Sequence, residues 1–109
     1  EPTILRGPDA AIIRKERKPT GKGVAGWLDG APDVAVEVIG DTQSDAELAS
    51  KALEYLSAGA RMVWVIDAVA EKVIVYSAPN QIRVLARDQD VDGGDVLPGF
   101  RCRVCELFE

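Results

Sequence analysis

The sequence predicts an α/β (α+β) fold in which a mixed β-sheet of about five to six strands packs against one main helix. Two apolar runs rich in β-branched residues come first, one segment with helical periodicity follows, and three more strand-like runs complete the pattern. An apolar fraction of 47% and a charged fraction of 28% are typical of a globular domain. We therefore place a single domain over residues 1–109.

The first two strands are expected at residues 9–13 (DAAII) and 33–39 (DVAVEVI). Gly7 and Pro8 precede the first run, while Pro32 and Gly40 flank the second. The connection between the two runs is polar and then glycine-rich, which favours a long hairpin with a projecting arm.

A helix is expected over residues 45–58. Ser44 and Glu47 form an S-x-x-E capping box, Asp45 adds negative charge to the first turn, and Gly59 supplies a left-handed stop. Five residues follow helical spacing and form a stripe on one side of the helix, which should pack on the sheet: Leu48, Ala52, Tyr55, Leu56 and Gly59.

The remaining chain reads as an antiparallel meander followed by irregular structure. The runs MVWVID, KVIVYS and IRVLAR are strand-like and are separated by short turn-prone segments. We expect a loop for DQDVDGGDVLPG, and a short strand or helical turn for FRCRVCELF.

Two acidic residues are predicted to meet at one end of this sheet. Asp9 starts the first strand, Glu37 lies near the end of the second, and their midpoint is residue 23, in the glycine-rich connection. A hairpin symmetric about that point would place the two Cβ atoms about 5 Å apart, which suits two oxygen ligands on one hard divalent ion.

Glu37 needs a partner in any case, because it interrupts an apolar run and shares a strand face with Ala35 and Ile39. A metal ion would meet this need. The alternative is a structural ion pair between a buried glutamate and a lysine or arginine at the sheet edge.

The order of several segments resembles the PD-(D/E)xK nuclease superfamily, and specifically its Uma-two family of restriction endonuclease-like proteins. The segments are GPDAAII, APDVAVEVIG, SKALEYLSAGA, MVWVID, KVIVY and LPGF. The resemblance covers nearly the whole chain and implies a restriction-endonuclease-like fold and metal-dependent hydrolysis of DNA phosphodiester bonds. It also implies that Asp9 and Glu37 bind Mg²⁺ (or Mn²⁺), with the backbone carbonyl of Val38 as a further ligand.

The chain departs from the superfamily pattern at two points. Ile39 stands where the superfamily has a lysine, two residues after the glutamate. Relatives in the family carry a lysine in the following helix instead, and Lys51 is the matching position, with a role in orienting or deprotonating the attacking water. The superfamily core also begins with a helix ahead of the P-D motif, so we expect this domain to be truncated at its N-terminus.

A basic segment is the candidate contact with DNA phosphates. It carries five bases and one acid, a local balance of +4, whereas the chain as a whole has a formal net charge of −5. The acidic total argues against a protein that binds polyanions over its whole surface, and a solvated hairpin tip is the alternative for this segment. The bases are Arg14, Lys15, Arg17, Lys18 and Lys22.

Other motifs fit their usual functions poorly. G-x-G-x-x-G at residues 21–26 does not open a helix, as a dinucleotide site would require. Residues 88–99 begin like a calcium loop but end on glycine instead of glutamate. Cys102 and Cys105 lack the further ligands of a zinc site, so packing is the better interpretation.

Two further aspartates, Asp33 and Asp67, are more typical of caps or turns than of ligands. Asp33 lies at the opposite end of the strand that carries Glu37, about 13 Å away at 3.3 Å per residue, too far to share an ion.

Three classes of function remain open from the sequence. The first is a Mg²⁺-dependent endonuclease, the second is an interaction or dimerisation module that keeps the fold without catalysis, and the third is a hydrolase acting on a small phosphoester. We also expect a homodimer, because a domain of this size has a small margin of stability on its own. A cytoplasmic location is expected, because no apolar run reaches the roughly 20 residues that a membrane span needs.

Overall fold

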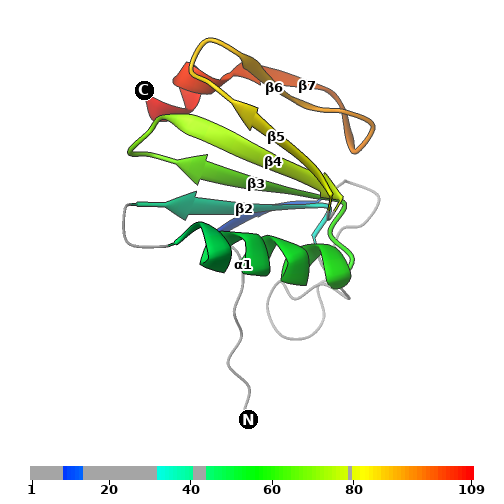
Figure 1. Ribbon diagram of the computed structural model, residues 1–109. Coiled ribbons are helices and arrows are strands. Elements are labelled where there is room, and N and C mark those ends of the chain that lie inside the picture. Colours follow the sequence, from blue (N-terminus) through cyan, green and yellow to red (C-terminus); the bar gives the residue numbers. More distant parts are fainter. Residues whose placement is uncertain (1–8, 14–31, 41–43, 79) are drawn as a thin grey trace.

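A five-stranded mixed sheet forms the centre of the computed structural model, which describes residues 9–13, 32–40, 44–78 and 80–109 (Figure 1). The strand order is β1-β2-β3-β4-β5, and β6 and β7 form a separate two-stranded sheet. β2 and β3 are parallel, whereas the other neighbours are antiparallel. In chain order the elements are β1 (Ala10–Ile12), β2 (Val34–Ile39), α1 (Asp45–Ser57), β3 (Met62–Asp67), β4 (Lys72–Ala78), β5 (Gln81–Leu85), β6 (Asp90–Gly93), β7 (Leu97–Arg103) and the 3-10 helix η2 (Val104–Phe108).

The first two strands pair in the register that the sequence predicted. Ala10 lies opposite Val36 and Ile12 lies opposite Val34, so the pairing is symmetric about position 23. Because β1 and β2 are antiparallel, the start of β1 and the end of β2 come to the same end of the sheet.

Helix α1 connects the two parallel strands and begins with the predicted capping box. The backbone N–H of Glu47 donates to Ser44 Oγ at 3.1 Å, and the backbone N–H of Ser44 donates to Glu47 Oε1 at 2.9 Å. The helix ends at Ser57, one residue before the predicted end, and Gly59 follows with a φ of 116°. Glycine takes this backbone conformation without steric cost.

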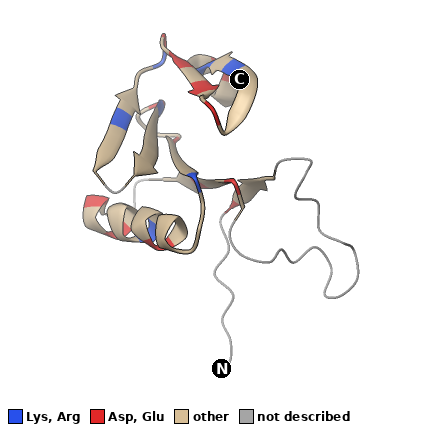
Figure 2. Ribbon diagram, turned by 90° about the vertical axis from the view of Figure 1, so that its right-hand side faces the viewer, with Lys and Arg blue, Asp and Glu red and all other residues tan. Residues whose placement is uncertain are grey.

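Alternate residues of the central strands build two separate clusters, one on each face of the main sheet. Leu48 and Ala52 of α1 cover one face, where they meet Ala35, Ile39 and Val63. Figure 2 shows α1 on one side of the sheet and the β6–β7 hairpin on the other. The second cluster joins the hairpin and η2 to the sheet and includes Val34, Val36, Trp64, Val75, Val91, Val96 and Val104.

The expectation of a loop over residues 88–99 is wrong. Most of this segment forms β6 and the start of β7, which pair as an antiparallel hairpin. Val91 is only 1% exposed and Val96 is also buried, so the hairpin contributes to the core. The aspartates and glycines around these two valines are typical of a loop, which is why the sequence pattern predicted one. In the hairpin turn, the N–H of Gly94 donates to Asp92 Oδ1.

The sequence predicted a sheet of about five to six strands, and the main sheet has five in the described part of the chain. β6 and β7 form the separate two-stranded sheet. No helix in the described part of the chain is long and apolar enough to cross a membrane.

Loss of the helix cap is expected to destabilise the fold. Ser44→Ala should lower the free energy of unfolding by about 1 kcal/mol, because a serine cap satisfies a backbone N–H that alanine leaves without a protein acceptor. Urea unfolding measures the change, and Ser50→Ala, on an exposed position of the same helix, is the matched control. Ser50→Ala should be neutral or slightly stabilising, and an equal loss from both variants would contradict the capping role.

Candidate functional site

Asp9 and Glu37 are brought together at one end of the main sheet. Continuing the register of β1 and β2 by one residue places Asp9 opposite Glu37. The backbone N–H of Asp9 donates to Glu37 Oε2 at 3.2 Å, and the N–H of Val38 donates to Asp9 Oδ2 at 2.8 Å. The predicted convergence of these two residues is therefore present in the fold.

The Glu37 carboxylate is buried on the face of the sheet that α1 covers. The residue is 4% exposed and lies on the same strand face as Ala35 and Ile39. Lys51 Nζ lies 2.8 Å from Glu37 Oε1, and the hydroxyl of Tyr55 donates to Glu37 Oε2 at 3.0 Å. Each carboxylate oxygen thus accepts a hydrogen bond, which offsets the cost of removing the charge from water.

Lys51, the lysine that the family resemblance implied, reaches Glu37 from helix α1. Lys51 and Tyr55 are four residues apart in α1, so both side chains project from the same face of the helix. The Lys51 side chain keeps 33% of its surface exposed, whereas that of Glu37 keeps 5%. The Lys51 side chain therefore extends from a partly exposed position to the buried carboxylate.

Tyr55 belongs to the site, although the sequence pattern assigned it to the apolar stripe of the helix. Burial raises the pKa of the Tyr55 hydroxyl above its ordinary value of 10.0, and the hydrogen bond to Glu37 and its negative charge raise it further. The hydroxyl is consequently a protonated donor at neutral pH. The only available signal in the sequence was that a partly buried tyrosine hydroxyl needs a hydrogen-bond partner.

The residues at this end of the sheet fit a hard divalent cation. Within the described part of the chain, Asp9 Oδ1 accepts no hydrogen bond, so it can act as a ligand. The N–H of Val38 faces Asp9, and the N–H and C=O of a strand residue project toward the same edge, so the Val38 carbonyl lies on that edge too. Carboxylate and carbonyl oxygens are the ligands that Mg²⁺ prefers.

This donor set is small. No cluster of three or more His, Cys, Asp or Glu side chains suited to a metal occurs among the described residues. Mg²⁺ nevertheless tolerates a small protein ligand set, because it commonly retains several waters and takes further ligands from substrate phosphates. The arrangement can thus hold a cation and orient a water beside it.

The other residues considered in the sequence are not part of the Asp9–Glu37 site among the described residues. Asp33 lies at the far end of β2, and its carbonyl accepts from the N–H groups of Arg61 and Met62, at 3.0 and 3.2 Å. Asp67 Oδ1 accepts from the N–H groups of Val69 and Ala70, at 3.0 and 2.9 Å, which is the turn role that was predicted. The basic residues Arg14, Lys15, Arg17, Lys18 and Lys22, and the glycine motif at residues 21–26, lie outside the described residues.

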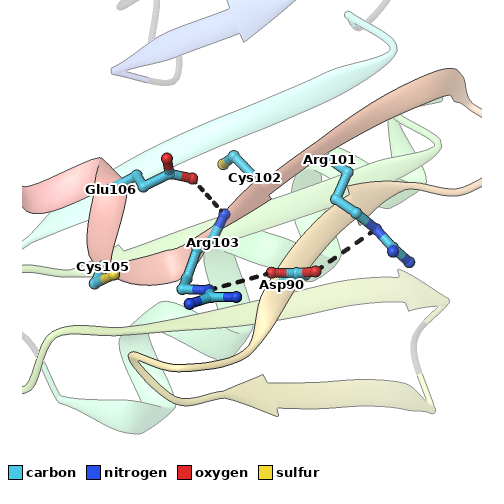
Figure 3. A pocket seen from close by; sticks show the side chains of 6 residues that line it. All are labelled: Asp90, Arg101, Cys102, Arg103, Cys105 and Glu106. Carbon is cyan, nitrogen blue, oxygen red and sulfur yellow. Dashed lines mark hydrogen bonds and ion pairs between the residues drawn. The ribbon is translucent and has the colours of Figure 1, made fainter.

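The two cysteines line a pocket of about 400 Å³ at the C-terminal end of the chain (Figure 3). Cys102 and Cys105 are free and half-buried, in agreement with a packing role, and burial raises the pKa of the Cys102 thiol. Asp90 in the same pocket lies 3.8 Å from Nε of Arg101 and of Arg103. This cluster contains no residue of the Asp9–Glu37 site.

Removing the lysine partner of Glu37 is expected to destabilise the protein. Lys51→Met should lower the free energy of unfolding by about 2 kcal/mol, because it leaves a buried carboxylate without its ion-pair partner. Urea unfolding at neutral pH measures the loss. Lys72→Met, at a half-buried lysine at the start of β4, is the matched control and should change stability by less than about 0.5 kcal/mol. Equal losses would mean that the ion pair contributes no specific stability.

Comparisons with known proteins place the chain in a family and identify a similar fold. The model of the Uma2 family, described as "Putative restriction endonuclease", matches residues 2–105. The fold is similar to the crystal structure of a protein from Anabaena variabilis described as "a putative nuclease belonging to DUF820", with a TM-score of 0.74 and 24% sequence identity. That similarity covers 93% of this chain and 58% of the Anabaena chain, so this chain spans a little over half of that protein's length.

No curated protein matches the chain. The family match nevertheless extends over nearly all of the sequence and agrees with the resemblance seen in the order of its motifs. This chain belongs to the Uma2 family of restriction endonuclease-like proteins.

Proposed function

We propose that this chain carries the metal-binding centre of a Mg²⁺- or Mn²⁺-dependent endonuclease that hydrolyses phosphodiester bonds in DNA. The observation that carries the proposal is the meeting of Asp9 and Glu37, 28 residues apart, beside the ammonium group of Lys51. Membership of a family described as "Putative restriction endonuclease" supports the class of reaction.

Asp9 and Glu37 would hold the cation, and the carbonyl of Val38 would be a further ligand. Two carboxylates supply the negative charge that retains a divalent ion, and the small protein ligand set leaves positions for water and a phosphate oxygen. A bound Mg²⁺ supplies Lewis acidity, which activates a water and neutralises charge on the phosphate.

Lys51 has the position of a residue that orients the attacking water. Its ammonium group has three hydrogen-bond donors, one of which points to Glu37 Oε1. The Lys51 side chain is one-third exposed, so it borders the solvent beside Glu37. A fixed positive charge at this place also favours the pentacovalent phosphorus state, in which negative charge develops.

DNA is proposed as the substrate because the reaction class and the basic segment from Arg14 to Lys22 both favour a polyanion. A homodimer and a cytoplasmic location remain predictions from the sequence.

A second candidate function is an interaction module that retains the fold without catalysis. The observation in its favour is that Lys51, Tyr55 and the N–H of Asp9 satisfy Glu37 without any cation. The network would then be a structural ion pair that joins α1 to the end of β2.

Metal binding is tested by calorimetric titration with Mn²⁺. The chain is expected to bind Mn²⁺, and Glu37→Ala should weaken binding by more than about tenfold because it removes one of two carboxylate ligands. Asp95→Ala, in the exposed turn between β6 and β7, removes the same charge away from the site and should bind as the unchanged chain does. Equal binding by the chain and Glu37→Ala would remove the assigned site.

Catalysis is tested with supercoiled plasmid incubated in Mg²⁺ or Mn²⁺. The chain should produce nicked and linear DNA. Lys51→Ala should lower the rate of cleavage by about 100-fold or more, as expected for a group that takes up a proton from the attacking water or orients that water. Lys72→Ala is the matched control and should cut at the original rate. Cleavage that is absent, or that survives unchanged in Lys51→Ala, would favour the interaction module.

A further inference from the structure

The Tyr55 side chain extends from helix α1 to the buried carboxylate of Glu37. Its ring packs against the cluster of apolar residues between α1 and the sheet, and its hydroxyl donates to Glu37 Oε2 at 3.0 Å. Packing therefore restrains the ring at the same time as the hydroxyl bonds to the carboxylate.

The two oxygens of Glu37 have different partners. Oε2 accepts from two neutral donors, the backbone N–H of Asp9 at 3.2 Å and the hydroxyl of Tyr55 at 3.0 Å, whereas Oε1 accepts from Lys51 Nζ at 2.8 Å. An ionised carboxylate has about two acceptor positions on each oxygen. The neutral donors thus fill Oε2, and the contacts among the described residues leave one position on Oε1.

The last torsion of a glutamate side chain is broad and intrinsically almost indifferent to rotation. Without specific donors, the plane of the carboxylate could take a range of orientations about this torsion. Tyr55 and the N–H of Asp9 oppose this rotation, because turning the group would break two hydrogen bonds.

We propose that Tyr55 is a positioning residue that fixes the rotation of the Glu37 carboxylate and presents Oε1 to a divalent cation. The inference rests on the proposed metal-binding function and extends it to a residue that does not itself contact the ion. A tyrosine suits this task because its hydroxyl is neutral. It orients the carboxylate without cancelling the negative charge that attracts the cation, as a second lysine would.

The test compares Tyr55→Phe with Tyr76→Phe by calorimetric Mn²⁺ titration and by thermal unfolding without metal. Both variants lose only a hydroxyl. Tyr76 is buried in the same cluster but lies on β4, and among the described residues its hydroxyl makes no hydrogen bond to Glu37. Tyr55→Phe should weaken Mn²⁺ binding about tenfold, as is usual when a residue that orients a metal ligand is removed, while Tyr76→Phe should stay within about twofold of the original.

The unfolding midpoint separates positioning from packing. A purely structural role would lower the midpoint and leave the affinity of the folded protein for Mn²⁺ unchanged, and that result would overturn the inference. Equal weakening of Mn²⁺ binding by both variants would overturn it too.

The failure of this inference is distinct from that of the proposed function. If the original chain binds Mn²⁺ and Tyr55→Phe binds it equally well, the metal site stands and the role of Tyr55 falls. If the original chain binds no Mn²⁺, the proposed function and the inference are both overturned.

Discussion

The buried carboxylate of Glu37 is the constraint on which this end of the structure depends. Removing a carboxylate from water costs several kcal/mol unless hydrogen bonds and opposite charge replace its hydration. The replacement comes from two directions, the backbone at the start of β1 and the side chains of Lys51 and Tyr55 in α1. The position of the helix over β2 and the pairing of β1 with β2 are consequently coupled through one side chain.

The same network also connects stability to function. A site that holds a divalent cation needs negative charge in a partly enclosed place, and such charge is unfavourable until the cation arrives. Lys51 offsets part of this cost for Glu37, while Asp9 remains exposed and is oriented by the N–H of Val38. The network is thus compatible with a cation site as well as with a structural ion pair.

Several features of the fold and site were predictable because they depend on periodicity and spacing. The symmetry of the first two strands about position 23 predicted the pairing that sets Asp9 against Glu37. The family resemblance pointed to Lys51 in the helix after Glu37, and its side chain reaches that carboxylate. The hairpin of β6 and β7 was missed, because its two buried valines stand among aspartates and glycines that are typical of a loop.

The sequence by itself determined most of the local elements and the end of the sheet at which the acidic residues meet. Capping, strand alternation and helical stripes arise from contacts within about four residues, so they are visible in a linear pattern. Only the tertiary structure decided that the Tyr55 hydroxyl turns to Glu37 and that the β6–β7 hairpin covers the second face of the sheet. Both depend on which surfaces pack together, and the chain must be folded before those surfaces exist.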